Sequence, residues 1–222
     1  TLGVTAVQNI SPDIVAAQID AVFDDIRPSA VKIGMVSSAE IIEVIADRLS
    51  ARNATNVVVD PVMVATSGAR LIAEDAAEAL TRRLFPLATV ITPNIPEATK
   101  LCGFDISSVD DMIKAAKVIG ENIRGSVLIK GGHLTGNADD LLYSQGKIRW
   151  YKGERIITEN THGTGCTLSS AIASNLALGF DMAQSVANAK AYITGALSTG
   201  LNLGRGSGPL NHCFNLKPFG HA

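Results

Sequence analysis

The sequence predicts an α/β fold in which helices cover both faces of a mostly parallel central sheet. Short, β-branched apolar runs alternate along the chain with segments of helical periodicity. These runs are apolar throughout, which is typical of strands buried on both faces. The 222 residues are 46% hydrophobic and 18% charged, so the chain is not disordered and can bury one sizeable core. We therefore expect a single domain over residues 1–222.

The expected elements follow one another regularly. Strands are expected at residues 31–35, 56–60, 89–92 and 126–130, with a hairpin at 140–144 and 147–151 around Gln145-Gly146. Helices are expected at residues 13–26, 39–52, 73–84, 96–101, 109–122, 167–178 and 182–200. Ligands of such folds bind at the carboxyl ends of the strands. Asp60, Asn94 and Lys130 lie at those ends.

Composition excludes several classes of protein. Lys and Arg number 19 against 21 Asp and Glu, a net charge of -2, which argues against a broad nucleic-acid-binding face. The cysteines, Cys102, Cys166 and Cys213, show no zinc-ligand or disulfide-framework spacing. This cysteine usage is typical of a reducing, cytoplasmic compartment. Residues 160–180 lack charge but contain too many polar side chains for a membrane span, and no signal peptide is visible.

The most informative motif is Thr161-His162-Gly163-Thr164-Gly165-Cys166-Thr167, which precedes an apolar helix. Gly163, Thr164 and Gly165 at a helix start would expose backbone N–H groups, which together with the helix dipole form a ready anion site. The simpler alternative is a flexible turn with a threonine cap. Cys166 is either a small buried apolar side chain or a thiol made reactive by the helix N-terminus.

The polar residues at the strand ends also allow two interpretations each. Asp60, before Pro61, is either a turn former or a magnesium ligand. Asn94 and Glu97 match a helix capping box, although Glu97 could also lie near magnesium, directly or through water. Lys130, before Gly131-Gly132-His133, is either an ordinary surface lysine or a contact to nucleotide phosphates.

Met35 and Val62 lie just past strand ends, where the ordinary expectation is core packing. Alternatively they line an apolar slot for a flat heterocycle. His133 and His212 have no partner at metal-ligand spacing, so we expect them in turns or at the edge of the core.

Together the motifs resemble one family. The matching segments, in register over residues 1–215, are 32–35, 57–63, 92–98, 127–133, 161–169 and 206–209. They resemble the bacterial hydroxymethylpyrimidine kinase / phosphomethylpyrimidine kinase family of thiamine biosynthesis, within the ribokinase-like superfamily. The resemblance implies a three-layer α/β/α fold and two ATP-dependent phosphorylations. The first acts on 4-amino-5-hydroxymethyl-2-methylpyrimidine, and the second converts its monophosphate to the diphosphate.

The resemblance also implies site roles. Gly163, Thr164 and Gly165 would form the anion hole, with Cys166 beside it. Lys130 would contact the ATP phosphates. Asp60 and Glu97 would organise Mg²⁺ and its water, supported by Asn94. Gly34, Met35 and Val62 would bind the pyrimidine. The family usually forms homodimers, and no nucleic-acid or membrane partner is expected.

The sequence departs from the wider superfamily in two respects. Many ribokinase-like sugar kinases have Asp at the position of Cys166. Family members also begin with a strand and a glycine-rich segment, which we expect before Thr1 and which this sequence omits. Two other functions stay open at this point. One is a pyridoxal or pyridoxine kinase, since the visible pocket residues do not separate the two substrates, and the other is a non-catalytic vitamin-binding protein.

Overall fold

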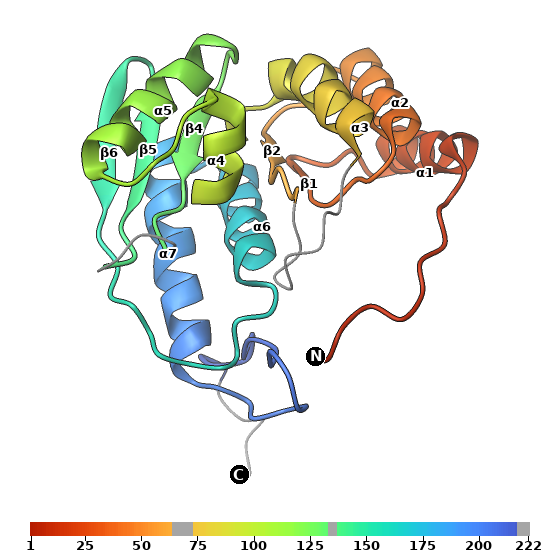
Figure 1. Cartoon of the computed structure of the whole chain (residues 1–222). Helices are drawn as coiled ribbons and strands as arrows, with labels where there is room; N and C mark the ends of the chain where they lie inside the picture. The colour runs from red at the N-terminus through yellow and green to blue at the C-terminus, as the bar shows by residue number, and fades with distance from the viewer. Residues whose placement is uncertain (64–72, 133–136, 217–222) are drawn as a thin grey trace.

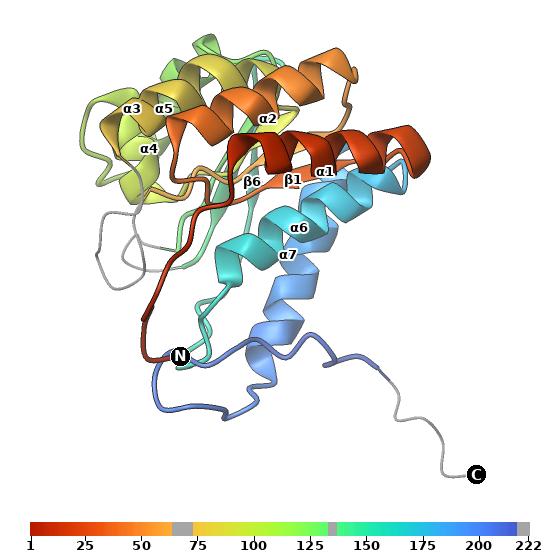
Figure 2. The ribbon, with the colours of Figure 1, turned by 90° about the vertical axis from the view of Figure 1, so that its right-hand side faces the viewer.

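The structure, a computed structural model, describes residues 1–63, 73–132 and 137–216. Six strands form one sheet, and helices pack against both of its faces (Figure 1). A quarter turn shows the layers: α1 to α5 lie over the sheet, and α6 and α7 lie beneath it (Figure 2). The predicted three-layer α/β/α architecture is confirmed. No helix in the described parts of the chain is long and apolar enough to cross a membrane.

The strands are short and the helices are mostly of ordinary length. The strands are β1 Val31–Ile33, β2 Val57–Val59, β3 Val90–Ile91, β4 Ser126–Ile129, β5 Asp140–Ser144 and β6 Lys147–Tyr151. The α-helices are α1 Pro12–Asp25, α2 Ala39–Ala51, α3 Glu74–Ala79, α4 Ile95–Cys102, α5 Val109–Glu121, α6 Thr164–Ala177 and α7 Met182–Ser198. A π turn, Leu80–Leu84, and a 3₁₀ turn, Phe85–Leu87, follow α3.

The order of the strands in the sheet is their order in the chain. β1 to β4 are parallel, and β5 and β6 complete the sheet as an antiparallel hairpin. Crossovers between parallel neighbours are right-handed, so stepping always in one direction places α2 to α5 on the same face. The hairpin turns at Gln145 (φ 50°) and Gly146 (φ 76°), the positive values that a two-residue turn of matching twist requires.

Alternate strand residues feed two separate cores. Val57 and Val59 pack into the core under α1 to α5, whereas Val58 packs into the core under α6 and α7. In β4, likewise, Ile129 packs into the core under α1 to α5 and Leu128 into the core under α6 and α7. All of these side chains are essentially inaccessible to solvent, which explains why the strands are apolar on both faces.

The main difference from the expected elements is the start of α6. The helix begins at Thr164 rather than at residue 167, because Gly163 takes the N-cap position in a left-handed conformation (φ 83°). Thr164 and Gly165 therefore belong to the first helical turn. The expected helix at 73–84 is divided, since its second half is the π turn.

Gly125 offers a test of how closely the segments that lead into β3 and β4 approach one another. A β-carbon at this position would lie 2.3 Å from the Ala88 carbonyl oxygen and 2.5 Å from that of Thr89. Because those atoms are backbone, Gly125→Ala should lower the free energy of unfolding by about 1–3 kcal/mol. Gly132→Ala is the control, since no atom of the described residues lies within 4 Å of its β-carbon position. Denaturant unfolding of both variants would show the difference, and equal midpoints would contradict it.

Candidate active site

The Asp60 carboxylate lies at the centre of the polar residues at the carboxyl ends of the strands. Asp60 directly follows β2 and is 2% exposed. Its Oδ1 accepts hydrogen bonds from Lys130 Nζ at 2.8 Å and from Thr92 Oγ1 at 3.0 Å. Lys130 follows β4 and Thr92 follows β3. One buried carboxylate therefore joins the ends of three adjacent strands, and the structure brings Asp60 and Lys130 together.

Asn94 and Glu97 form the expected capping box at the start of α4. The Asn94 side chain accepts from the Glu97 N–H at 2.9 Å, and Glu97 Oε2 accepts from the Asn94 N–H at 2.8 Å. Asn94 also forms an isolated parallel bridge with Lys130. This bridge places the start of α4 beside the Lys130–Asp60 pair.

Glu97 is electrostatically coupled to that pair. Its side chain is buried, and the pKa of its carboxyl is raised, chiefly by desolvation and further by the Asp60 charge, while Lys130 opposes the rise. Two neighbouring carboxylates thus share one lysine. Among the described residues, no group of three or more His, Cys, Asp and Glu side chains is arranged to hold a metal ion.

The first turn of α6 faces the same ion pair. A β-carbon on Gly165 would lie 3.2 Å from Lys130 Nζ and 3.6 Å from Asp60 Oδ2, so a glycine permits this approach. The helix has no side-chain cap. The Thr164 N–H donates to the Thr161 carbonyl at 3.3 Å, whereas those of Gly165 and Cys166 have no acceptor among the described residues. The N–H of Gly163 likewise has no acceptor among the described residues, so the open N–H donors at this turn are those of Gly163, Gly165 and Cys166.

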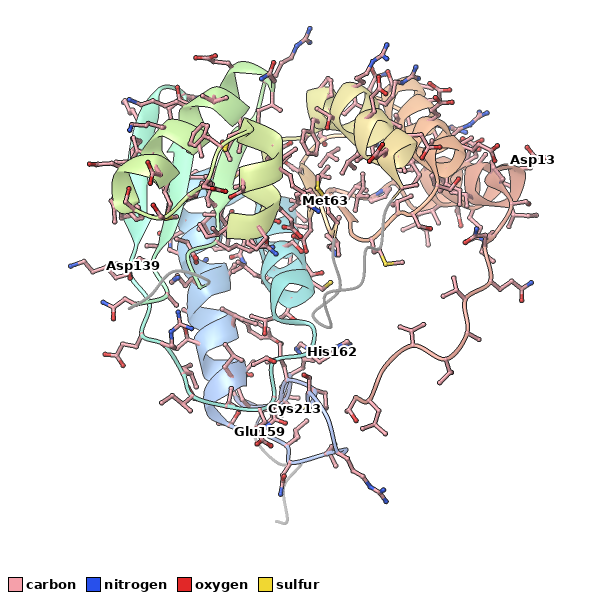
Figure 3. The ribbon with its side chains drawn as sticks, viewed as in Figure 1. Asp13, Met63, Asp139, Glu159, His162 and Cys213 are labelled. Atoms are coloured by element: carbon pink, nitrogen blue, oxygen red, sulfur yellow. The ribbon has the colours of Figure 1, made fainter. Side chains whose placement is uncertain are left out.

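A cavity of about 730 Å³ adjoins this helix terminus. Cys166, Ser170 and Ser174 line it from α6, and Tyr192 lines it from α7. Cys166 is exposed, so it is not the buried apolar side chain of the simpler interpretation. His162, labelled in Figure 3 just before α6, contributes to the mouth.

The expected substrate residues occupy a different part of the strand-end edge. Met35 follows β1 and is 50% exposed, and Val62 follows β2 and is half-buried. The Lys32 side chain lies over Gly34, with Nζ 2.5 Å from where a β-carbon would be. None of Gly34, Met35 and Val62 is among the described residues that line the cavity at Cys166.

Sequence reasoning assigned no role to Thr92, Asp140 and Lys190. Thr92 supports Asp60, and the other two form a buried ion pair next to Gly131. Two signals for this pair are present in the sequence: Asp140 is a charged residue at the start of an apolar strand, and Lys190 is a lysine flanked by alanines in α7. His212 stacks on Tyr192 in the cavity wall, whereas His133 lies outside the described residues.

Comparison with known proteins identifies the family. The phosphomethylpyrimidine kinase family model matches residues 1–211. A hydroxymethylpyrimidine/phosphomethylpyrimidine kinase of Rhizobium meliloti is 48% identical over 96% of this chain and 81% of that protein. The chain belongs to the phosphomethylpyrimidine kinase family. The bifunctional thiamine biosynthesis protein ThiED of Geobacter sulfurreducens is 47% identical over 96% of this chain, which spans only 44% of that relative's length.

Solved structures agree with this family membership. A phosphomethylpyrimidine kinase of Clostridium difficile superposes with a TM-score of 0.78 at 47% identity, covering 86% of this chain and 79% of that one. A Bacillus subtilis pyridoxal kinase, solved as an ADP complex, has a TM-score of 0.86 at 38% identity, covering 94% and 78%. The fold of the family is thus shared with a pyridoxal kinase that was solved with bound ADP.

The raised pKa of Glu97 predicts a pH-dependent stability difference. A carboxyl whose pKa is higher in the folded state contributes stability that is present below its unfolded pKa and is lost as pH rises through the folded value. Glu97→Gln cannot titrate. The free energy of unfolding of the variant minus that of the wild type should therefore increase as pH rises from about 4 towards neutrality.

Urea unfolding at a series of pH values would measure this difference. Glu43→Gln is the matched control, because Glu43 is an exposed carboxylate of α2. A Glu97→Gln difference that stays constant with pH would show that Glu97 has an ordinary pKa in the folded protein.

Proposed function

We propose that the protein is a kinase that transfers phosphate from ATP to 4-amino-5-hydroxymethyl-2-methylpyrimidine, and then from a second ATP to the monophosphate. The observation that carries the proposal is the position of Lys130 and Asp60 against the uncapped first turn of α6. A cation, a carboxylate and open amides at one point are the groups that phosphoryl transfer requires.

The charge of the transferring group would be stabilised by α6 and Lys130. The N–H groups of Gly163, Gly165 and Cys166 lie at the start of α6, in the same turn as Thr164, where the helix dipole favours anions. The Lys130 ammonium has three donors, of which one is engaged by Asp60. The other donors would bind phosphate oxygens, and their effect would be greatest where charge develops in the transition state.

Mg²⁺ fits the two coupled carboxylates. Asp60 and Glu97 are oxygen donors close enough to influence one another, and Mg²⁺ is commonly held by one or two carboxylates together with substrate phosphates. Directly or through water, these residues would hold the ion, with Asn94 fixing Glu97. The bound ion would neutralise phosphate charge. Chelation with EDTA should accordingly abolish turnover.

The pyrimidine would lie between Met35 and Val62, beside Gly34. These residues follow neighbouring parallel strands, so they share the edge of the sheet that holds Asp60.

A homodimer in the cytoplasm stays our expectation from the family, and sedimentation would test the oligomeric state.

Pyridoxal kinase is the second candidate, favoured by the likeness to the Bacillus subtilis enzyme. Its substrate is also a flat hydroxymethyl heteroaromatic. Parallel assays with ATP and each substrate would separate the candidates: we expect turnover of the pyrimidine and of its monophosphate. Activity on pyridoxal alone would overturn the proposal, and binding without turnover would indicate the non-catalytic vitamin-binding protein.

Lys130→Ala should lower kcat by about 10²–10³ and leave the KM for the pyrimidine nearly unchanged. The reason is that a phosphate contact of this kind acts mainly on the transition state. Steady-state kinetics with saturating ATP would measure both constants. Lys147→Ala, at an exposed lysine of β6, is the control. A Lys130→Ala enzyme with the wild-type kcat would rule out this role.

Substitution of Cys166 should affect the two steps unequally. In the first step the hydroxyl nucleophile must lose a proton, which the Cys166 sulfur could accept in its thiolate form. In the second step the phosphate oxygen is already ionised, since the second pKa of a monoester is about 6. Cys166→Ala should therefore slow the first step more than the second. Losses of equal size would mean that Cys166 only shapes the cavity.

Cys166→Asp provides the complementary variant. Its carboxylate could serve as a base for the alcohol, but it would repel the dianionic monophosphate by roughly 4 kcal/mol for each pair of unit charges 4 Å apart at an effective dielectric of 20. We expect the first step to persist in part and the second to be largely lost. Separate assays with each substrate would measure this, and a well-preserved second step would contradict the electrostatic argument.

A further inference from the structure

A second buried ion pair lies directly behind Lys130. Lys190 of α7 donates to Asp140 Oδ2 at 2.5 Å and to the Ala138 carbonyl oxygen at 2.6 Å. The Lys190 and Asp140 side chains are only 12% and 9% exposed. The other carboxylate oxygen, Asp140 Oδ1, accepts from the Gly131 N–H at 2.9 Å. Since Gly131 follows Lys130, the ion pair is one peptide away from the proposed phosphate contact.

The register of the sheet places this pair on the same face as the Lys130 side chain. Leu128 of β4 pairs with Leu142 of β5, and both pack into the core under α6 and α7. Alternation along each strand brings Lys130 and Asp140 to that face as well. Accordingly Lys130 approaches α6, and Asp140 meets Lys190 of α7.

The surrounding backbone leaves little freedom of movement. A β-carbon on Gly131 would lie 1.8 Å from the carbonyl oxygen of Asp139, the residue labelled in Figure 3 before β5. A β-carbon on Gly153 would lie 2.6 Å from Lys190 Cε. The Ala138 N–H donates to the Gly153 carbonyl at 2.8 Å. The segment at residues 138–140 and Gly153 therefore enclose the Lys190 ammonium.

A buried ion pair is a poor source of stability, because desolvation offsets much of the attraction between its members. The effect of this ion pair is instead to hold the backbone in place. The Gly131 N–H is held by a carboxylate that is itself held by an ammonium, and a buried, satisfied network of this kind restricts the backbone to one conformation.

We propose that Lys190 and Asp140 are positioning residues that fix the Gly131 peptide and thereby the direction in which Lys130 presents its ammonium group. The inference rests on the proposed function, because a phosphate contact by Lys130 gives the positioning its purpose. With side chains only 12% and 9% exposed, the two residues would act through Lys130 and not by contact with the substrate. Their effect on turnover should therefore depend on Lys130.

A double-mutant cycle tests that dependence. Lys190→Met should lower kcat about tenfold, since misplacement of a group by a fraction of an ångström is costly, and should leave the KM for the pyrimidine within about twofold. In a Lys130→Ala background the same substitution should change kcat by less than about twofold. If the loss of kcat in the double variant equalled the product of the losses in the two single variants, the proposal would be overturned.

A matched pair of variants avoids leaving a buried charge unpaired. Asp140→Asn/Lys190→Met keeps an oxygen that can accept from the Gly131 N–H, whereas Asp140→Ala/Lys190→Met removes it; both remove the two charges. The Ala/Met enzyme should be at least about threefold slower than the Asn/Met enzyme. Equal kcat values would overturn positioning through Gly131. Arg52→Met, which breaks the pair between Arg52 at the end of α2 and Asp20 of α1, should leave kcat unchanged.

Amide hydrogen exchange separates this proposal from the proposed function. In the protein without substrates, the Gly131 N–H should exchange about tenfold faster in the Ala/Met variant than in the Asn/Met variant. The Asp60 N–H, which donates to the Ile33 carbonyl, should exchange equally in both. Equal Gly131 rates would overturn the positioning. If the wild type phosphorylated no substrate, the proposed function would fail, yet the exchange comparison would still decide the positioning.

Discussion

The buried Asp60 carboxylate is the constraint on which the site depends. A charge removed from water must find partners of its own, and these come from Lys130 and Thr92, at the ends of two other strands. The three strand ends must therefore stay in register within hydrogen-bond tolerance. The first turn of α6 can close over this group because Gly165 has no side chain there.

The start of α4 shows that a structural and a functional interpretation need not exclude each other. Asn94 and Glu97 cap the helix reciprocally, which is sufficient reason for both residue types. The same hydrogen bonds hold the Glu97 carboxylate in a buried place beside Asp60 and Lys130. The cap therefore fixes a buried carboxylate beside the Asp60–Lys130 pair at no extra conformational cost.

The sequence was sufficient for the fold because its signals are local. Apolar runs marked the strands, and periodicity marked α2 and α5 to within a residue or so. Contacts between residues that lie far apart in the sequence could not be predicted in the same way. The packing of Gly165 on Lys130 and the joining of Lys190 to Asp140 depend on segments 35 and 50 residues apart, and no local pattern records such distances. The start of α6 was misjudged because a left-handed Gly163 cap extends the helix into what looks like a loop.

Neighbouring strands of the sheet are also consecutive in the chain, and this order has a consequence for the protein while it is being synthesised. Each strand from β2 onward pairs with the one made just before it, so one face is covered by α2 to α5 as translation proceeds. The other face, with Val58, Val90 and Leu128, has no covering helix until α6 and α7 leave the ribosome. A nascent chain stalled before residue 164 would carry a bare apolar surface, the kind that chaperones bind and that aggregates. Because the first turn of α6 also closes the site, catalytic competence arrives together with burial of that face.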